Sequence, residues 1–307
     1  MTDLALLVAG GGGQLGMDLY HRVRETLGDG STLYAPTSAE LDITDQAAVG
    51  AAVTRLAEEA AEHGRRPVVI NAAAYTAVDA AEADESTAMR VNRDGPARLA
   101  AACTALDVPL IHVSTDYVFP GDAERPYEPS DPTGPRSAYG RTKLAGERAV
   151  LDICPRAWVV RTAGVYGAWG GNFVKTMAKL EANRETLSVV SDQAMSPTWA
   201  GDLAIGLLEL AMRIADGSEP ARRVLHATND GQTTWFEFAR AIFVELGADP
   251  ERVRPCGTEE FPRPAPRPAF SVLSANSWIS EGLTPLQPWR AGLAEAFAQH
   301  EDAFRPA

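Results

Sequence analysis

The chain has few cysteines, fewer basic than acidic residues, and no long run of apolar residues. Its three cysteines, Cys103, Cys154 and Cys256, are widely separated and match no metal-ligand spacing, so we expect reduced thiols in a cytoplasmic protein without a metal site. The 28 basic residues are outnumbered by 41 acidic ones, and the resulting net charge of −13 disfavours nucleic-acid binding. The first residues show no basic segment and only a short apolar run, so we expect neither a signal peptide nor a membrane span.

Short apolar segments alternate with segments of helical periodicity through the first half of the chain. Strands are predicted at 4–9, 32–35, 67–71, 109–114 and 158–161. Helices are predicted at 14–27, from a cap at Thr44 or Asp45 through Glu62, at 86–106 and from Tyr139 onward. This alternation predicts an α/β fold with a doubly wound parallel (Rossmann) sheet. After Arg161 we expect glycine-rich and irregular stretches at 164–172 and 191–199, helices at 202–214 and 234–246, a strand at 224–227 and a proline-rich segment at 261–270.

The change of rhythm after Arg161 predicts two lobes. Residues 1–162, completed by parts of 198–230, form the expected NAD(P)-binding domain. Residues 163–197 and 231–307 form the expected smaller C-terminal substrate-binding lobe.

A glycine-rich loop joins the first predicted strand to the first helix. Gly10, Gly13 and Gly16 form the pattern Gly-x-x-Gly-x-x-Gly, and Gln14 and Leu15 open the helix. Glycine permits the tight turn and lets a pyrophosphate approach backbone N–H groups at the positive end of a helix. By itself the loop fits a turn without a ligand equally well, but its position between strand and helix favours a dinucleotide.

The end of the second strand bears on the choice of cofactor. No acidic residue stands there to bind a free ribose 2′-hydroxyl, whereas Thr37 and Ser38 are able to donate to a 2′-phosphate. We therefore expect NADPH, with NADH tolerated. Asp42 and Ile43 are expected to flank the adenine, and a turn or cap is the alternative role for Asp42.

Tyr139 and Lys143 lie four residues apart at the start of a predicted helix, so both project from one face. The ammonium is expected to lower the pKa of the phenol and to suit it to proton transfer. Upstream, Ser114-Thr115-Asp116 ends a strand at the edge where ligands bind in parallel sheets. We expect the Thr115 hydroxyl to orient a substrate carbonyl, and bonding to the local backbone is its alternative role.

Longer strings carry a resemblance to a known family. The glycine loop is followed by Asn-Ala-Ala-Ala-Tyr-Thr-Ala-Val-Asp at 71–79, Ser-Thr-Asp-Tyr-Val-Phe-Pro-Gly at 114–121 and Tyr-Gly-Arg-Thr-Lys-Leu-Ala-Gly-Glu at 139–147. These resemble the extended short-chain dehydrogenase/reductases. With Asn-Phe-Val-Lys-Thr-Met at 172–177, Asp-Gln-x-x-x-Pro-Thr at 192–198 and Pro-Arg-Pro at 266–268, the chain resembles the dTDP-4-dehydrorhamnose reductase family almost end to end.

The resemblance implies an enzyme that reduces the C4 ketone of a dTDP-4-keto-6-deoxyhexose with hydride from the nicotinamide, first of all dTDP-4-dehydrorhamnose to dTDP-L-rhamnose. It makes Tyr139 the proton donor, has Lys143 lower the phenol pKa and hold the nicotinamide ribose, and has Thr115 orient the carbonyl. Asn92 resembles a structural asparagine of the family, or is an ordinary buried amide. Further residues are implied along the cofactor (Ala72, Ala73 and Ala74) and around the sugar nucleotide (Thr115, Asp116, Tyr117, Gly164, Asn172, Phe173 and Arg267).

The chain departs from the family pattern at two places. Gly164 replaces a tryptophan that in the family lies against the sugar, and its loss is expected to widen the pocket. A different deoxysugar, as in antibiotic glycosylation, therefore stays open as the substrate. Trp169 is a candidate to fill the space of the missing indole. Gly201 replaces a glutamate that bridges some members through a metal, so we expect a monomer or weak homodimer. The family also includes a non-catalytic regulatory subunit of methionine adenosyltransferase, but the intact Thr115, Tyr139 and Lys143 favour an enzyme.

Overall fold

A six-stranded sheet forms the centre of the protein in the computed structural model, which describes residues 4–28 and 32–305. The strand order is β10-β5-β4-β3-β1-β2, and every neighbouring pair is parallel. The strands are β1 (Leu4–Ala9), β2 (Thr32–Tyr34), β3 (Arg66–Asn71), β4 (Leu110–Thr115), β5 (Ala157–Thr162) and β10 (Val224–His226). The doubly wound parallel sheet predicted from the sequence is thereby confirmed.

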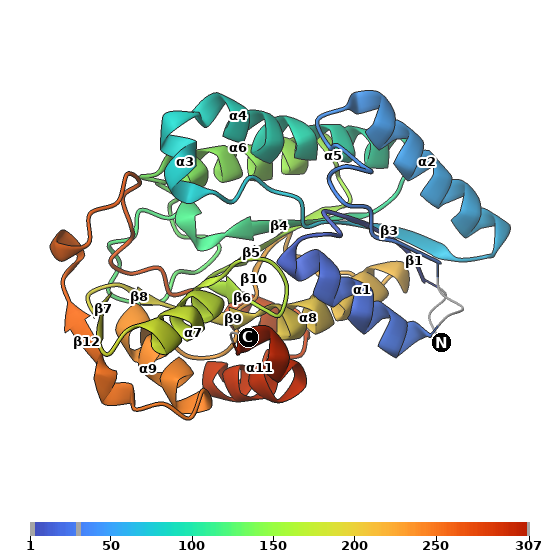
Figure 1. Cartoon of the computed structure of the whole chain (residues 1–307). Coiled ribbons are helices and arrows are strands. Elements are labelled where there is room, and N and C mark those ends of the chain that lie inside the picture. Colours follow the sequence, from blue (N-terminus) through green and yellow to red (C-terminus); the bar gives the residue numbers. More distant parts are fainter. Residues whose placement is uncertain (1–3, 29–31, 306–307) are drawn as a thin grey trace.

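Helices cover both faces of this sheet (Figure 1). One face carries α2 (Gln46–Glu62), α5 (Gly95–Ala105) and α6 (Ala138–Ile153), and the other carries α1 (Gln14–Leu27) and α8 (Ala200–Ala215). Successive side chains of a strand point to opposite faces, so β1 contributes to both apolar cores. Its residues divide into Leu4, Leu6 and Val8 toward α1 and α8, and Ala5, Leu7 and Ala9 toward α2 and α5.

Side-chain caps fix where two of these helices begin. Asp45 Oδ1 accepts hydrogen bonds from the N–H groups of Ala47 and Ala48, at 2.8 and 3.1 Å, at the start of α2. Ser137 Oγ accepts from the Gly140 N–H at 3.1 Å, at the start of α6. Because a capped helix begins at a defined residue, Tyr139 is held in the first turn of α6.

The helix predicted at 86–106 is interrupted. The chain forms α4 (Glu85–Met89), then a π-helical turn (Arg90–Asp94), and only then α5. Pro96 has no N–H to donate to the carbonyl four residues before it, and the Gly95 N–H bonds to the Arg90 carbonyl, as in a wider turn. A further short helix, α3 (Val78–Ala83), precedes this segment, where the sequence predicted none.

The second half of the chain builds an apolar cluster of its own beside the sheet, at the lower left of Figure 1. Three helices pack around it: α7 (Phe173–Asn183), α9 (Trp235–Glu245) and α11 (Trp289–Phe304). Short strands pair as β7 (Leu187–Val190) with β12 (Val253–Cys256), β8 (Ala194–Met195) with β11 (Thr233–Thr234), and β6 (Val165–Tyr166) with β9 (Thr198–Trp199). The remaining short elements are α10 (Asn276–Ser280) and 3-10 turns at Asp116–Val118, Pro250–Arg252 and Thr258–Glu260.

Several expectations for this half need correction. Residues 191–199 contain β8 and β9, although the sequence predicted an irregular stretch; strands of two residues are too short to show a periodic pattern. Helices α7, α10 and α11 and strands β7 and β12 were not predicted, and β6 lies inside the stretch 164–172 that was predicted to be irregular. The boundaries of the two expected lobes stay a prediction.

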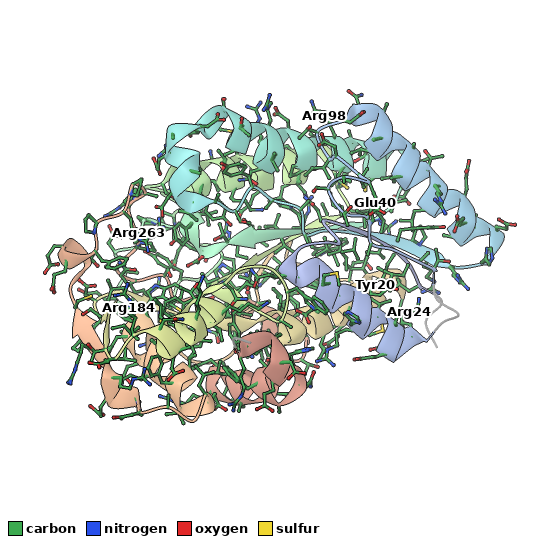
Figure 2. All side chains as sticks on the ribbon, in the orientation of Figure 1. Tyr20, Arg24, Glu40, Arg98, Arg184 and Arg263 are labelled. Atoms are coloured by element: carbon green, nitrogen blue, oxygen red, sulfur yellow. The ribbon has the colours of Figure 1, made fainter. Side chains whose placement is uncertain are left out.

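Side chains fill the space between the helices and the sheet (Figure 2). All three cysteines are buried free thiols. None of the helices in residues 4–28 and 32–305 combines the length and the apolarity needed to cross a membrane. Within the same residues, no three His, Cys, Asp or Glu side chains are grouped in a way that would hold a metal ion.

Candidate active site

A cleft of about 900 Å³ opens at the carboxyl ends of the central strands. It is lined by most of the residues predicted for the site: Gly10, Gly13, Gln14, Leu15, Gly16, Thr37, Ser38, Asp42, Ile43, Ala72, Ala73, Ala74, Thr115, Asp116, Tyr117, Tyr139, Lys143 and Gly164. Segments that are distant in the sequence therefore meet in one cavity, as expected at the carboxyl edge of a doubly wound sheet.

The glycine loop leaves no room for side chains at the N-terminus of α1. A Cβ on Gly10 would lie 2.7 Å from the Ala73 nitrogen, and one on Gly16 would lie 2.2 Å from the Gly10 carbonyl oxygen. Gly10 also has a φ of +85°, in the left-handed region that favours glycine. The loop thus brings bare backbone to the N-terminus of a helix, which suits a pyrophosphate. The residues present fit a dinucleotide.

The adenosine end of the cleft differs from the expectation at Thr37. The Thr37 N–H and Oγ1 both donate to Glu40 Oε2, at 2.8 and 2.9 Å, so the donors expected to meet a 2′-phosphate already have a partner. Asp42 Oδ1 accepts from the Thr44 N–H and Oγ1, both at 2.8 Å, and so takes the turn-forming role left open by the sequence.

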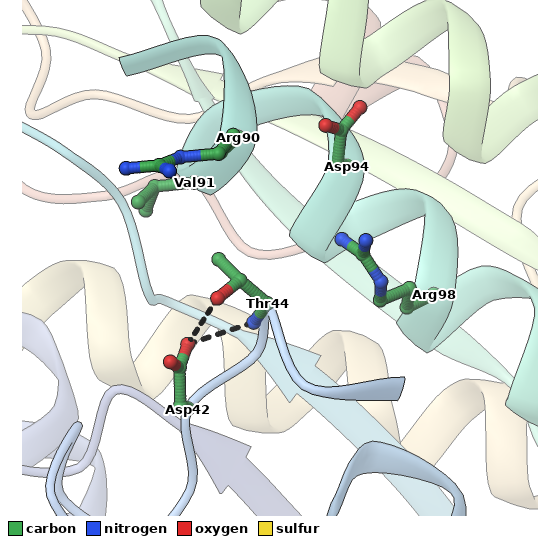
Figure 3. A pocket seen from close by; sticks show the side chains of 6 residues that line it. All are labelled: Asp42, Thr44, Arg90, Val91, Asp94 and Arg98. Carbon is green, nitrogen blue, oxygen red and sulfur yellow. Dashed lines mark hydrogen bonds between the residues drawn. The ribbon is translucent and has the colours of Figure 1, made fainter. Parts of the chain in front are cut away.

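A second cavity of about 470 Å³ adjoins this end and shares Asp42 and Val91 with the cleft. Figure 3 shows Asp42 with its two bonds to Thr44, and Arg90, Asp94 and Arg98 on the facing helical segment. Among the described residues, Arg98 Nη1 is buried without a hydrogen-bond partner.

The predicted reacting groups converge at the other side of the glycine loop. The hydroxyl of Tyr139 lies beside that of Thr115, and Thr115 Oγ1 donates a hydrogen bond to Asp116 Oδ1 at 2.8 Å. The Tyr139 ring packs edge-on against Tyr117, with 5.7 Å between ring centroids. Lys143 Nζ donates to the Val113 carbonyl of β4 at 2.7 Å, which holds the ammonium against the wall of the cleft.

Burial dominates the protonation of these groups. It raises the pKa of Tyr139 to about 12, and the hydrogen bond to Thr115 opposes this rise only in part. Burial likewise lowers the pKa of Lys143 to about 8, against the opposing charge of Glu147. The expected lowering of the phenol pKa is therefore wrong for this structure, because desolvation of the phenolate outweighs any help from the ammonium. At neutral pH the phenol keeps its proton and is able to donate it.

Asn92, in the π-helical turn, is a structural clamp. Its Oδ1 accepts from the Tyr75 N–H at 2.8 Å, and its Nδ2 donates to the Tyr75 carbonyl at 3.1 Å and to Thr142 Oγ1 at 3.0 Å. The fully buried amide thereby joins the segment after β3 to the helix that carries Tyr139 and Lys143. This geometry agrees with both roles that the sequence left open.

Three residues predicted for the sugar nucleotide lie outside the wall of the cleft. Asn172 caps α7 and donates to Gln14 Oε1 at 3.0 Å and to the Gly167 carbonyl at 2.8 Å. Phe173 packs against Trp235, with 4.6 Å between ring centroids. Arg267 pairs with Asp79 Oδ1 at 2.9 Å and donates to the Ala265 carbonyl at 3.2 Å.

The expected replacement for the missing tryptophan is also corrected. Trp169 stacks on His21 of α1, with 5.4 Å between ring centroids, and does not line the cleft. The indole on the cleft wall is that of Trp235, the first residue of α9. Gly164 has a φ of +54°, and a Cβ there would lie 3.0 Å from the Ser196 carbonyl oxygen, so a side chain at this position would strain the loop.

The sequence missed several other lining residues. Most of them come from short segments of the second half: Thr162, Ala163, Val165, Gly170, Gly171, Gln193, Ala194, Met195, Trp235, Pro268 and Ser271. The first half adds Gly12, Leu41, Thr76, Val78, Val91 and Val113. A usable signal existed for Gln193, which belongs to the string Asp-Gln-x-x-x-Pro-Thr, and for Pro268, which belongs to Pro-Arg-Pro. The remaining ones carry no chemical mark in the sequence, since they are small or apolar residues brought in by packing.

Comparison with known proteins places the chain in a family. The model of the RmlD substrate binding domain family matches residues 4–301. The chain belongs to this family. It is 50% identical over 298 residues to a dTDP-4-dehydrorhamnose reductase of Mycobacterium tuberculosis, covering 95% of this chain and 92% of that one. It is 44% identical to a dTDP-4-keto-6-deoxy-D-glucose reductase of Streptomyces niveus, with 97% of each chain covered.

A solved structure of this family has the same fold. The dTDP-4-dehydrorhamnose reductase of Bacillus anthracis, determined in complex with NADP, is 33% identical and superposes with a TM-score of 0.87, covering 97% of this chain and 100% of that one. The resemblance stated from the sequence is thereby confirmed.

Proposed function

We propose that this protein is an NADPH-dependent reductase of the C4 ketone of dTDP-4-keto-6-deoxyhexoses, with conversion of dTDP-4-dehydrorhamnose to dTDP-L-rhamnose as its principal reaction. One observation carries the proposal: Thr115, Tyr139 and Lys143 meet in the same cleft as the glycine loop. The relatives named above are reductases of such sugars, and the superposed structure holds NADP.

Each residue of this group has a chemical task that follows from its surroundings. When bound, the reduced nicotinamide supplies a hydride to C4. Tyr139, which keeps its proton at neutral pH, donates it to the C4 oxygen. Thr115, whose hydroxyl lies beside that of Tyr139, orients that oxygen, and the charged Lys143 stabilises the phenolate left behind.

We propose the division of labour expected from the sequence. Residues 1–162, with parts of 198–230, bind NADPH, whereas 163–197 and 231–307 bind the sugar nucleotide. In support, the lining residues Gln193, Met195, Trp235 and Ser271 all come from the second set. In the cleft, Asp116, Tyr117 and Gly164 face the sugar. Asn172 and Phe173 support the cleft wall from behind, and Arg267 binds the sugar nucleotide after its ion pair with Asp79 opens.

A different deoxysugar is the second candidate substrate, because Gly164 adds no side chain to the sugar end and the relatives include a dTDP-4-keto-6-deoxy-D-glucose reductase. We further propose a cytoplasmic monomer or weak homodimer. In support, the three cysteines form no disulfide with one another, and Gly201 offers no ligand for a bridging metal. Sedimentation with and without a chelator tests the oligomeric state, and a chelator-sensitive dimer would contradict it.

The function is tested by incubating the pure protein with NADPH and, in parallel, with dTDP-4-dehydrorhamnose and other dTDP-4-keto-6-deoxyhexoses. We expect oxidation of NADPH, with the highest kcat/KM for dTDP-4-dehydrorhamnose and a 4-hydroxy product by NMR. A higher value for another sugar would select the second candidate. Absence of turnover with every sugar would favour the non-catalytic regulatory subunit instead.

A further inference from the structure

The turn after β2 is held closed by one carboxylate. Glu40 Oε2 accepts from the Thr37 N–H at 2.8 Å and from Thr37 Oγ1 at 2.9 Å, and the Glu40 N–H donates back to the Thr37 carbonyl at 3.0 Å. Figure 2 places Glu40 on the loop between β2 and α2. The Glu40 carboxylate thus accepts hydrogen bonds from both donors of Thr37.

This turn lies directly against the glycine loop. The Gly11 N–H donates to the Pro36 carbonyl at 2.9 Å, and a Cβ on Gly12 would lie 3.1 Å from Thr37 Cγ2. Thr37 and Ser38 line the cleft together with Gly12. In a dinucleotide-binding sheet, the residues that follow the second strand face the ribose next to adenine. Glu40 itself is exposed and does not line the cleft, but its carboxylate is bonded to Thr37, which does, and so reaches the edge where the ribose 2′-substituent is expected.

The charge of Glu40 is not neutralised by the protein. Within residues 4–28 and 32–305, no Arg or Lys forms an ion pair with this exposed side chain. The hydrogen bonds from Thr37 hold the pKa of Glu40 below its usual value, so the carboxylate is ionised at neutral pH. An ionised carboxylate accepts a hydrogen bond from a hydroxyl and repels a phosphate.

We infer that Glu40 sets the choice between the two nicotinamide dinucleotides, accepting the ribose 2′-hydroxyl of NADH and opposing the 2′-phosphate of NADPH. The inference rests on the proposed function, because it concerns the dinucleotide assigned to this cleft. NADH binds with the turn as it stands. NADPH binds when Glu40 swings away and leaves the Thr37 donors to the phosphate, so the protein uses both dinucleotides and binds NADPH more weakly than Thr37 alone would allow.

The test measures dissociation constants of NADPH and NADH for the purified full chain by quenching of tryptophan fluorescence, without any sugar. Glu40→Gln keeps the size of the side chain and an acceptor for Thr37 but removes the charge. We expect it to tighten NADPH binding about tenfold and to change NADH binding by less than about twofold. Glu62→Gln, at the exposed end of α2, removes the same charge far from the cleft and should leave both constants unchanged.

A second variant separates charge from support of the turn. Glu40→Ala frees both Thr37 donors, so we expect NADPH binding to tighten at least as much as in Glu40→Gln. An unchanged NADPH-to-NADH ratio in both variants, or a parallel loss of both dinucleotides, would overturn the inference and leave Glu40 as a turn-forming residue. Failure of the wild-type protein to bind either dinucleotide would instead overturn the proposed function.

Discussion

The two ends of the cleft differ in whether backbone atoms or side chains form their surface. At the cofactor end, residues of the glycine loop present backbone, and a Cβ on Gly10, Gly11 or Gly16 would lie within 3 Å of neighbouring backbone atoms. At the sugar end, side chains such as Met195, Trp235 and Ser271 arrive from separate segments of the second half. A site made by backbone depends on residues with no substitute, whereas a site made by side chains depends on packing between distant segments.

Tyr139 lies between the cofactor end and the sugar end of the cleft. Its substitution is expected to have the largest effect on turnover. Tyr139→Phe removes the proton donor but keeps the ring that packs against Tyr117. We expect kcat to fall about a thousandfold while the dissociation constants of NADPH and the sugar nucleotide stay within about twofold. Steady-state kinetics and fluorescence titration measure both quantities. Near-normal turnover of the variant would remove Tyr139 from the mechanism.

The helix that carries Tyr139 is tied to the strand leading into the sugar end by a buried ion pair. Arg161 Nε and Nη2 donate to the two oxygens of Glu147 at 2.9 and 2.7 Å, and the side chains are only 5% and 2% exposed. Glu147→Gln leaves the guanidinium without its charge partner in the interior, so we expect the free energy of unfolding to fall by about 3 kcal/mol.

A surface pair on the same helix provides the control for this prediction. Arg141 binds Glu85 with similar geometry, but the two side chains are 42% and 37% exposed. Glu85→Gln is therefore expected to cost less than about 1 kcal/mol. Urea denaturation of both variants gives the comparison, and equal losses would show that burial does not set the strength of these pairs.

The same contrast explains how much the sequence could predict. Strands buried on both faces, such as β1, are continuous apolar runs, and the glycine pattern and the Tyr139–Lys143 spacing are local signals. The interruption before α5 depends on a proline and the π-helical turn it favours, which periodicity alone does not reveal. Trp235 could not be assigned to the site, because only the packing of α9 brings it to the cleft wall.

Protonation of Lys143 gives a pH-dependent test of the cofactor end. Burial lowers the pKa of Lys143 from 10.5 to about 8, so the folded protein loses this charge before the unfolded chain does. We expect kcat/KM to fall about tenfold per unit above about pH 8. Over the window from about 8 to 10.5 the unfolded chain binds more protons, so Lys143 adds stability as the pH rises. A flat kcat/KM profile across about pH 7 to 9 would contradict the assigned charge.

The smallest effect on catalysis is expected at the sugar end. There Trp235 supplies an indole, whereas Gly164 stands where the family has a tryptophan. Its ring lines the cleft and is supported from behind by Phe173, so it forms a fixed apolar wall. Trp235→Ala should raise the KM for the sugar nucleotide about fivefold, with kcat and NADPH binding little changed, because the lost contact is made equally in the ground state and the transition state.

The adjacent aromatic residue of α9 makes this last prediction specific. Phe236 is next in the chain and half-buried but does not line the cleft, since its ring lies beneath Arg240. Phe236→Ala removes a smaller aromatic ring from the same turn, and it should leave the KM for the sugar nucleotide unchanged. If both variants raised KM alike, the wall would depend on the stability of α9 and not on the indole. If NADPH binding weakened in Trp235→Ala alone, the two ends of the cleft would not be separable.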